Sequence, residues 1–354
     1  MKDLVKRSIE IIKEGQAPSG AYIASPNFQN YAYSWFRDGA FIAYSMDLVG
    51  EHHSARRFHE WAAGVISSNF DVISRAIEVV DQTGKPSKTD FLHTRYTLDG
   101  QVDQGEWPNN QLDGIGTWLW ALKAHLDLAG GDLPEYVLKS AELAVRYLSV
   151  LWQFPCSDCW EEFHDQIHTY TLAAIQAGIK AFSDLSGIDH QSVIDDIQET
   201  ILNQCVKNGH FTKRLGSEDV DANLIALAVP YGVVDSGHPM MAATIKKIKE
   251  DLTGTEGLHR YAGDTFYGGG EWILLSAWLG WYWAEKGNKK RARELLSWIE
   301  SQADEKGYLP EQVPDHLNKS EYYKIWVERW GKIANPLLWS HAKYLILKNI
   351  LDQI

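Results

Sequence analysis

Hydrophobic residues recur along this chain at the three- and four-residue spacing of amphipathic helices, whereas the alternation typical of strands is scarce. This pattern predicts about twelve helices. We expect them at residues 2–14, 38–49, 53–80, 110–129, 134–152, 161–185, 190–206, 219–229, 238–252, 271–286, 288–302 and 334–353. No stretch has the composition of a linker, so we expect residues 1–354 to form one domain.

The predicted helices are of two kinds, and the two kinds alternate. Segment 271–286 is apolar on nearly all sides, which is typical of a helix surrounded by other helices. Segment 288–302 has one apolar face and one charged face, which is typical of an outer helix. The alternation predicts an all-α fold, an (α/α)6 barrel of about twelve helices in two concentric rings. An irregular bundle or a solenoid also fits the periodicity, although no residue-level repeat supports a solenoid.

Composition and charge narrow the possible partners. The 34 Lys and Arg against 47 Asp and Glu give a formal charge of −13, which argues against nucleic acid and against an anionic membrane surface. No apolar run is long enough to span a bilayer, and the N-terminus has no apolar signal region, so we expect a soluble cytoplasmic protein. The 15 Trp and 16 Tyr suit a carbohydrate site and equally suit a large helical core.

Metal-binding patterns are weak in this sequence. Cys156 and Cys159 have CxxC spacing, but the third cysteine stands alone, whereas a structural zinc site needs about four ligands. We interpret this pair as small buried or half-buried thiols. His52, His53 and His59 lie among charged residues, which indicates a solvated helix face. We therefore expect no metal and no other cofactor.

Polar and aromatic clusters lie just before the predicted inner helices. On a barrel, these entry loops meet at one end, where functional groups are commonly placed. Each cluster alone is also compatible with a capped or solvated helix start. The clusters occupy residues 33–38, 105–113, 158–162, 219–223, 260–272 and 309–312.

Three carboxylates in these clusters suit acid–base chemistry. Adjacent Glu161 and Glu162 repel, which raises the pKa of one of them and suits a general acid. Glu311 lies beside a proline on a predicted loop, which suits a fixed general base. Two carboxylates on opposite sides of a sugar perform inverting glycoside hydrolysis when they are about 6.5–9.5 Å apart.

Taken in order, the clusters resemble glycoside hydrolase family 15, the glucoamylase family, from about residue 20 to the C-terminus. The segment Leu309-Pro310-Glu311-Gln312 is similar to the part of that family that carries the general base. A Pro-Leu-Leu-Trp-Ser-His-Ala segment that starts at Pro336 is similar to its final inner helix. The other matching segments are Trp35-Phe36-Arg37-Asp38, Trp107 with Asp113, Trp160-Glu161-Glu162, Asp221-Ala222-Asn223-Leu224, and Arg260-Tyr261 with Asp264 and Trp272.

The resemblance implies a role for each matching residue. The first Glu of the pair, Glu161, is the expected general acid, Glu311 the general base, and Glu162 a ligand at subsite +1. Arg37, Asp38 and Arg260 are expected to hold the terminal glucose at subsite −1. The further substrate-binding residues that we expect are Trp35, Trp107, Asp113, Trp160, Asp264 and Trp272.

Two features depart from the family pattern. Phe36 stands where Pro is common, and segment 314–330 is long and aromatic, so we expect it to form a wall of the plus subsites. The β-sandwich and the starch-binding module of many members do not occur in this sequence, which favours a short, soluble substrate.

We therefore expect an inverting exo-acting α-glucosidase that releases β-glucose from short α-glucosides. Isomaltose-type α-1,6 linkages are slightly favoured over α-1,4 linkages. One alternative is a non-catalytic carbohydrate-binding or regulatory barrel, against which the presence of both carboxylates argues. Another is a different (α/α)6 sugar enzyme, an epimerase or a uronyl hydrolase, for which His164 and His168 are the histidines nearest a cluster.

Overall fold

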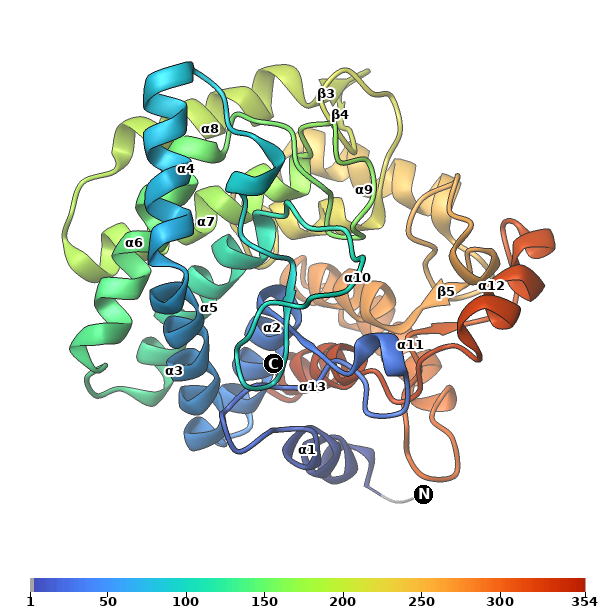
Figure 1. Cartoon of the computed structure of the whole chain (residues 1–354). Coiled ribbons are helices and arrows are strands. Elements are labelled where there is room, and N and C mark those ends of the chain that lie inside the picture. Colours follow the sequence, from blue (N-terminus) through green and yellow to red (C-terminus); the bar gives the residue numbers. More distant parts are fainter. Residues whose placement is uncertain (1–2, 354) are drawn as a thin grey trace.

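The inner helices of the protein form a closed ring (Figure 1). The computed structural model describes residues 3–353. Each member of the ring contacts the next, and the last contacts the first, which confirms the predicted all-α (α/α)6 barrel. The members are α2 (Phe36–Leu48), α5 (Asp113–Ala129), α7 (Thr169–Ser186), the 3-10 helix η3 (Ala222–Leu227), α10 (Ile273–Glu285) and α13 (Leu338–Gln353).

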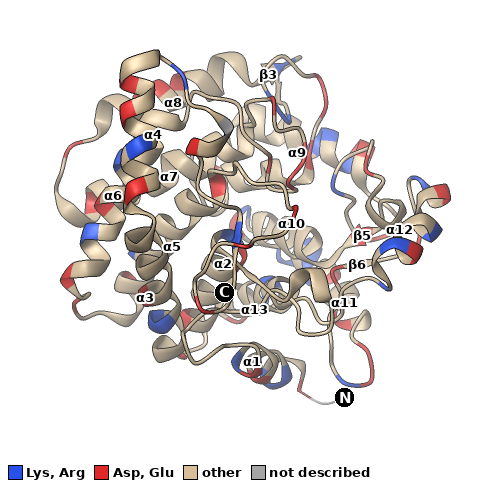
Figure 2. Cartoon of the chain, viewed as in Figure 1, with Lys and Arg blue, Asp and Glu red and all other residues tan. Residues whose placement is uncertain are grey.

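An outer layer of helices covers this ring, and each outer helix turns one apolar face inward. In α11 the buried positions are Ala292, Leu295, Leu296, Trp298 and Ile299, as the sequence predicts. Figure 2 shows that positions of acidic and basic residues alternate along outer helices such as α1 and α4. The outer helices are α1 (Leu4–Glu14), α3 (His52–Ser68), α4 (Phe70–Thr83), α6 (Glu135–Leu151), α8 (Gln191–Gln204), α9 (Pro239–Leu252) and α11 (Lys289–Ser301). Within residues 3–353, no helix combines the length and the apolar character that a membrane crossing requires.

Short antiparallel strand pairs tie the loops together where inner helices begin. Strand β1 (Ser34–Trp35) pairs with β2 (Arg95–Tyr96) and leads into α2. Strand β5 (Glu271–Trp272) pairs with β6 (Gln312–Val313) and leads into α10. A third antiparallel pair consists of β3 (Val206–Lys207) and β4 (His210–Phe211). The first two pairs hold Trp35 and the residue before β6, Glu311, on fixed backbone.

The structure differs from the predicted helices in four places. Region 53–80 is two helices, because the Asn69 side chain donates to the Val65 carbonyl at 2.8 Å and ends α3. Region 161–168 is a loop, since Glu161 and Phe163 adopt positive φ angles of 65° and 51° that an α-helix excludes. Region 219–229 holds only η3. A helix that the sequence did not predict, α12 (Tyr323–Trp330), lies in the long aromatic segment.

The burial of individual side chains tests two sequence predictions, one for the histidines of α3 and one for the cysteines. His59 is fully buried, so the prediction of a solvated face is wrong for this residue, although His53 is exposed. The cause is that His59 lies on the apolar face of α3 with Phe58 and Ala62 and packs against the His125 ring. All three cysteines are buried and unpaired, as predicted for Cys156 and Cys159.

One buried charge-bearing side chain lies inside the barrel without a hydrogen-bond acceptor among residues 3–353. The Nζ atom of Lys343, on α13, is 3.4 Å from the ring centroid of Phe41 and 3.3 Å from that of Trp278. Burial lowers the pKa of Lys343 well below its usual value, because the charged form loses its hydration.

We expect Lys343→Met to raise the free energy of unfolding by about 1–4 kcal/mol at pH 7, because methionine can be buried without losing a proton or hydration. Replacement of buried ion pairs by apolar side chains often stabilises by this amount. The unfolded lysine binds a proton up to its ordinary pKa of about 10.4, whereas the folded one does not. Wild-type stability should therefore rise with pH toward that value, and the difference between the two proteins should narrow. Denaturant unfolding at pH 7 and pH 9.5 measures both effects, with Lys348→Met on the same helix as control. A variant less stable than wild type at pH 7 would show that the aromatic faces outweigh the lost hydration.

Candidate active site

The entry loops of the inner helices enclose a pocket of about 440 Å³, a size typical of small-molecule sites. Ten of the twelve predicted site residues line it. These are Trp35, Arg37, Asp38, Trp107, Trp160, Glu161, Glu162, Arg260, Trp272 and Glu311. Asp113 and Asp264 lie behind this lining, where each contacts an arginine.

Arg37 lies at the start of α2 and is 4% exposed. Its Nη1 atom is 3.1 Å from Oδ2 of Asp113, and its Nη2 atom is 3.5 Å from Oδ2 of Asp38 and from Oε1 of Glu161. Asp113 therefore fixes the guanidinium from behind, and the open side faces the pocket. A fixed guanidinium beside a carboxylate offers donors and acceptors to neighbouring sugar hydroxyls.

Arg260, which also lines the pocket, is held in the same way. Its Nε atom donates to Oδ2 of Asp264 at 2.7 Å, and its Nη2 atom is 3.5 Å from Oε1 of Glu162. Tyr261 donates its hydroxyl proton to Oε2 of Glu162 at 2.5 Å. The Glu162 side chain is 34% exposed, so it lies nearer the mouth of the pocket than Arg260, at 4%.

Glu161 is held by donors on both carboxylate oxygens. Trp35 Nε1 donates to Oε1 at 2.7 Å, and Trp107 Nε1 donates to Oε2 at 3.0 Å. Burial raises the pKa of Glu161 to about 7, against the opposing effects of Arg37 and the two indoles. Its positive φ angle of 65° is a strained conformation of the kind that clusters at functional sites.

A buried ion cluster beneath the 158–163 loop maintains this conformation. Asp158 Oδ1 accepts from the backbone amides of Trp160 and Glu162, each at 2.9 Å. Lys213 Nζ is 3.0 Å from Asp158 Oδ2 and 2.6 Å from Asp221 Oδ2, which also accepts from Trp160 Nε1 at 2.9 Å. The cluster around Asp221 therefore supports the loop from below. No sequence signal singled out Lys213.

Glu311 occupies another wall of the pocket, directly before β6. Tyr31 donates its hydroxyl proton to Oε1 at 2.9 Å, whereas Oε2 has no hydrogen-bond partner among residues 3–353. Burial raises the pKa of Glu311 to about 8, and the Tyr31 hydrogen bond opposes this rise. The free oxygen can accept a proton from a water molecule in the pocket.

Sequence reasoning missed some pocket residues and anticipated others. Tyr31 and Arg95 carried no signal, because each is a single residue outside the motifs. Trp326, Arg329 and Trp330 lie in the segment expected to form a wall of the plus subsites; they line the pocket, but from helix α12 rather than a loop. The Trp330 ring stacks on that of Trp107 with centroids 5.7 Å apart, and Arg95 lies over Trp107 at 3.7 Å.

Known proteins resemble this chain over nearly its whole length. The family model of the glycosyl hydrolases family 15 matches residues 1–349. The isomaltose glucohydrolase of Kribbella flavida is 40% identical over 359 residues, covering 99% of this chain and 93% of that protein. A glycosidase variant solved in complex with glucose is also 40% identical, with a TM-score of 0.95 over 99% of this chain and 97% of that chain. A bacterial glucoamylase solved with acarbose has a TM-score of 0.75 at 20% identity, over 98% of this chain and 55% of that chain, which shows a shared fold.

Proposed function

Because this chain belongs to the glycosyl hydrolases family 15 and is a glycoside hydrolase, we propose that it is an inverting exo-α-glucosidase that releases β-glucose from short α-glucosides. The observation that carries the proposal is the pair Glu161 and Glu311, which line one pocket but are held by different partners. The non-catalytic barrel and the epimerase are set aside, since the chain is a glycoside hydrolase. Membership of family 15 and the 40% identity to an isomaltose glucohydrolase argue against the uronyl hydrolase.

The depth of the polar groups supports attack on chain ends. Arg37, Asp38 and Arg260 are all at least nine-tenths buried at the starts of the inner helices or the loops before them. The terminal glucose would bind there, with its non-reducing end innermost. The following sugar would contact Glu162 and the ring of Trp330 nearer the mouth. The identity to an isomaltose glucohydrolase favours an α-1,6 linkage at this point.

The proposed reaction is one displacement at the anomeric carbon. Glu161 donates its proton to the glycosidic oxygen as the bond from that oxygen to C1 breaks. Water attacks C1 from the opposite face and transfers a proton to Glu311, so the α-glucoside yields β-glucose. After the step Glu161 is a carboxylate, which Arg37 and the two indole N–H groups stabilise, and Glu311 carries a proton. Exchange with solvent restores both groups.

We expect the activity to follow a bell-shaped pH profile with its maximum near pH 7.5. Glu161 must be protonated, so activity falls as the pH rises above the pKa of about 7; Glu311 must be ionised, so activity falls as the pH drops below the pKa of about 8. The productive form of the pair is most populated midway between these values. The measurement is kcat/KM on isomaltose from pH 5 to pH 10.

The control for this profile is Tyr31→Phe. Loss of the Tyr31 hydrogen bond raises the pKa of Glu311, so kcat/KM should fall on the acidic side, remain unchanged on the alkaline side, and have its optimum at higher pH. A wild-type optimum below pH 6 would contradict the assignment.

Proton NMR of the anomeric signals at early times, with isomaltose and maltose in parallel, tests the proposed function. We expect β-glucose first, and faster from isomaltose. Appearance of α-glucose first would rule out inversion and the role of Glu311. Faster release from maltose would reverse the linkage preference, and absence of glucose from isomaltose, maltose and trehalose would reject the proposal as a whole.

A further inference from the structure

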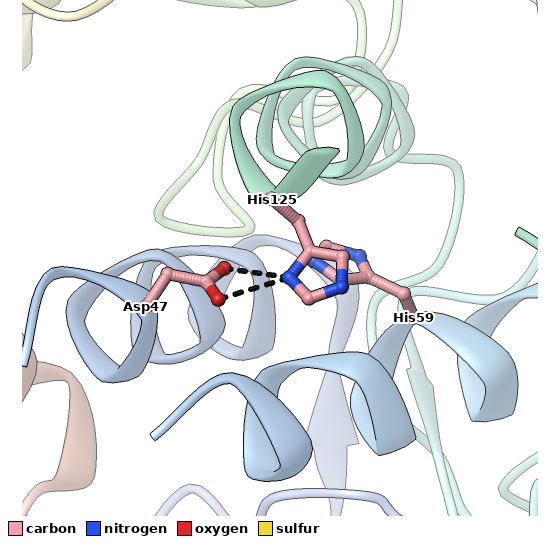
Figure 3. A group of neighbouring side chains, drawn as sticks. All are labelled: Asp47, His59 and His125. Carbon is pink, nitrogen blue, oxygen red and sulfur yellow. Dashed lines mark hydrogen bonds and ion pairs between the residues drawn. The ribbon is translucent and has the colours of Figure 1, made fainter. Parts of the chain in front are cut away.

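A group of buried acidic and imidazole side chains lies at the other end of α2. Asp47 in α2, His125 in α5 and His59 in α3 converge there (Figure 3). One carboxylate oxygen and one nitrogen of each ring lie within 4.8 Å of one another. Asp47 and His125 are each 3% exposed, and His59 is 0% exposed. We call these three residues the Asp–His–His group.

His59 is the unexplained member of the Asp–His–His group. His125 Nδ1 lies 2.9 and 3.0 Å from the two Asp47 oxygens, and His52 Nδ1 lies 2.8 Å from Asp47 Oδ1. By contrast, neither ring nitrogen of His59 has a hydrogen-bond partner among residues 3–353. A buried polar side chain left without a partner is costly, and native structures contain few of them.

Both imidazole rings of the Asp–His–His group lie beside a carboxylate. The Asp47 carboxylate supplies negative charge at hydrogen-bond distance from His125. In Figure 3 both imidazole rings lie on the same side of this carboxylate.

We propose that the Asp–His–His group binds a divalent transition-metal ion, with zinc as the ion best matched to its ligands. Two imidazole nitrogens and one carboxylate oxygen suit zinc, whereas calcium and magnesium prefer oxygen ligands. Ligand bonds of about 2.0–2.2 Å place the donor atoms of a tetrahedral site roughly 3.3 Å apart, which small side-chain rotations would achieve here.

His52 fits an outer position in this site. It contacts the Asp47 carboxylate, and 40% of its side chain is exposed, so it lies between the Asp–His–His group and solvent. A carboxylate that binds a metal ion is commonly oriented by a hydrogen bond from a neighbouring side chain, as His52 would provide here. Rotation of His52 would open the path by which the ion enters, and water or His52 would complete the coordination.

The bound ion would act on the scaffold and not on the sugar. Asp47 follows Asp38 by nine residues in α2, which places it about 14 Å further along the helix. The three ligands come from two inner helices and one outer helix, so the ion would fasten α3 to the ring. The proposal is independent of the proposed function.

The test compares zinc binding by wild type and by His59→Leu. Loss of His59 removes one ligand but breaks no hydrogen bond, so the variant is expected to fold. Protein dialysed against a chelator is titrated with zinc chloride by calorimetry, and its thermal unfolding is followed with and without zinc. His53→Ala, an exposed histidine on the same helix, is the matched control.

We expect wild type and His53→Ala to bind one zinc ion per chain and to gain roughly 3–5 °C in Tm at a hundredfold excess over Kd. His59→Leu should lose both effects. Asp47→Asn keeps the shape of the side chain but not its charge, and should weaken zinc binding at least tenfold, which tests the site even if His59→Leu fails to fold. No tight zinc binding by wild type, or equal binding by wild type and His59→Leu, would overturn the proposal.

Discussion

Glu311→Gln should lower kcat on isomaltose by about 10²–10⁴-fold, the usual contribution of a general base. Glutamine matches glutamate in shape, and its amide oxygen can still accept the Tyr31 hydrogen bond that holds Glu311 at 2.9 Å. The amide cannot take a proton from water, because it is not basic. The variant therefore loses the basic oxygen that faces the pocket, and the side chains around it stay in place.

The informative comparison for this variant is Glu162→Gln, which removes the same charge from the same pocket. Glu162 contacts Arg260 and Tyr261 near the mouth, so its loss should raise KM more than it lowers kcat. Circular dichroism and thermal unfolding establish that both variants are folded. If Glu311→Gln retained full activity, the base would have to be another residue.

Glu161→Gln should lower kcat on isomaltose by about 10²–10⁴-fold but act much more weakly on α-glucosyl fluoride. The sugar released from isomaltose is a poor leaving group, so its departure requires the proton that Glu161 donates. Fluoride is a good leaving group and departs with little help from an acid. The size of the effect should therefore depend on the leaving group, which distinguishes loss of the acid from general damage to the site.

The surroundings of Glu161 add a second expectation for the same variant. Trp35 and Trp107 donate to opposite oxygens of the carboxylate, and glutamine can accept from one of them only. One indole N–H is then left facing an amide N–H, so stability should fall by about 1–3 kcal/mol. Steady-state kinetics on both substrates, together with denaturant unfolding, measure the two effects. An equal loss on isomaltose and on the fluoride would contradict the role of Glu161 as acid.

Segments 271–286 and 288–302 show what the hydrophobic periodicity of a helix can predict about its place in the fold. The first is apolar on nearly all sides and becomes the inner helix α10, and the second becomes the outer helix α11. A helix must bury its apolar surface, so the fraction of its circumference that is apolar indicates which ring it joins. The same rule cannot find α12, whose eight residues are all half-buried or exposed.

The sequence motifs likewise predicted some properties of the site residues and not others. The motifs located Arg37, Glu161, Arg260 and Glu311, since entry loops on a barrel share one end. The motifs did not distinguish Asp113 and Asp264, which orient the arginines, from residues that line the pocket. That distinction depends on which side of an arginine a carboxylate lies, and spacing along a chain does not encode it.

The sequence by itself therefore determined the helical barrel, the end at which its functional loops meet and the residue types in those loops. These features follow from local periodicity and from connectivity. The tertiary structure alone decided that Tyr31 holds Glu311, that Lys213 supports the loop of Glu161, and that His59 is buried beside Asp47 and His125. Each of these contacts joins residues that lie far apart along the chain or on different elements. Their energies depend on distance and burial in space, which a one-dimensional pattern does not contain.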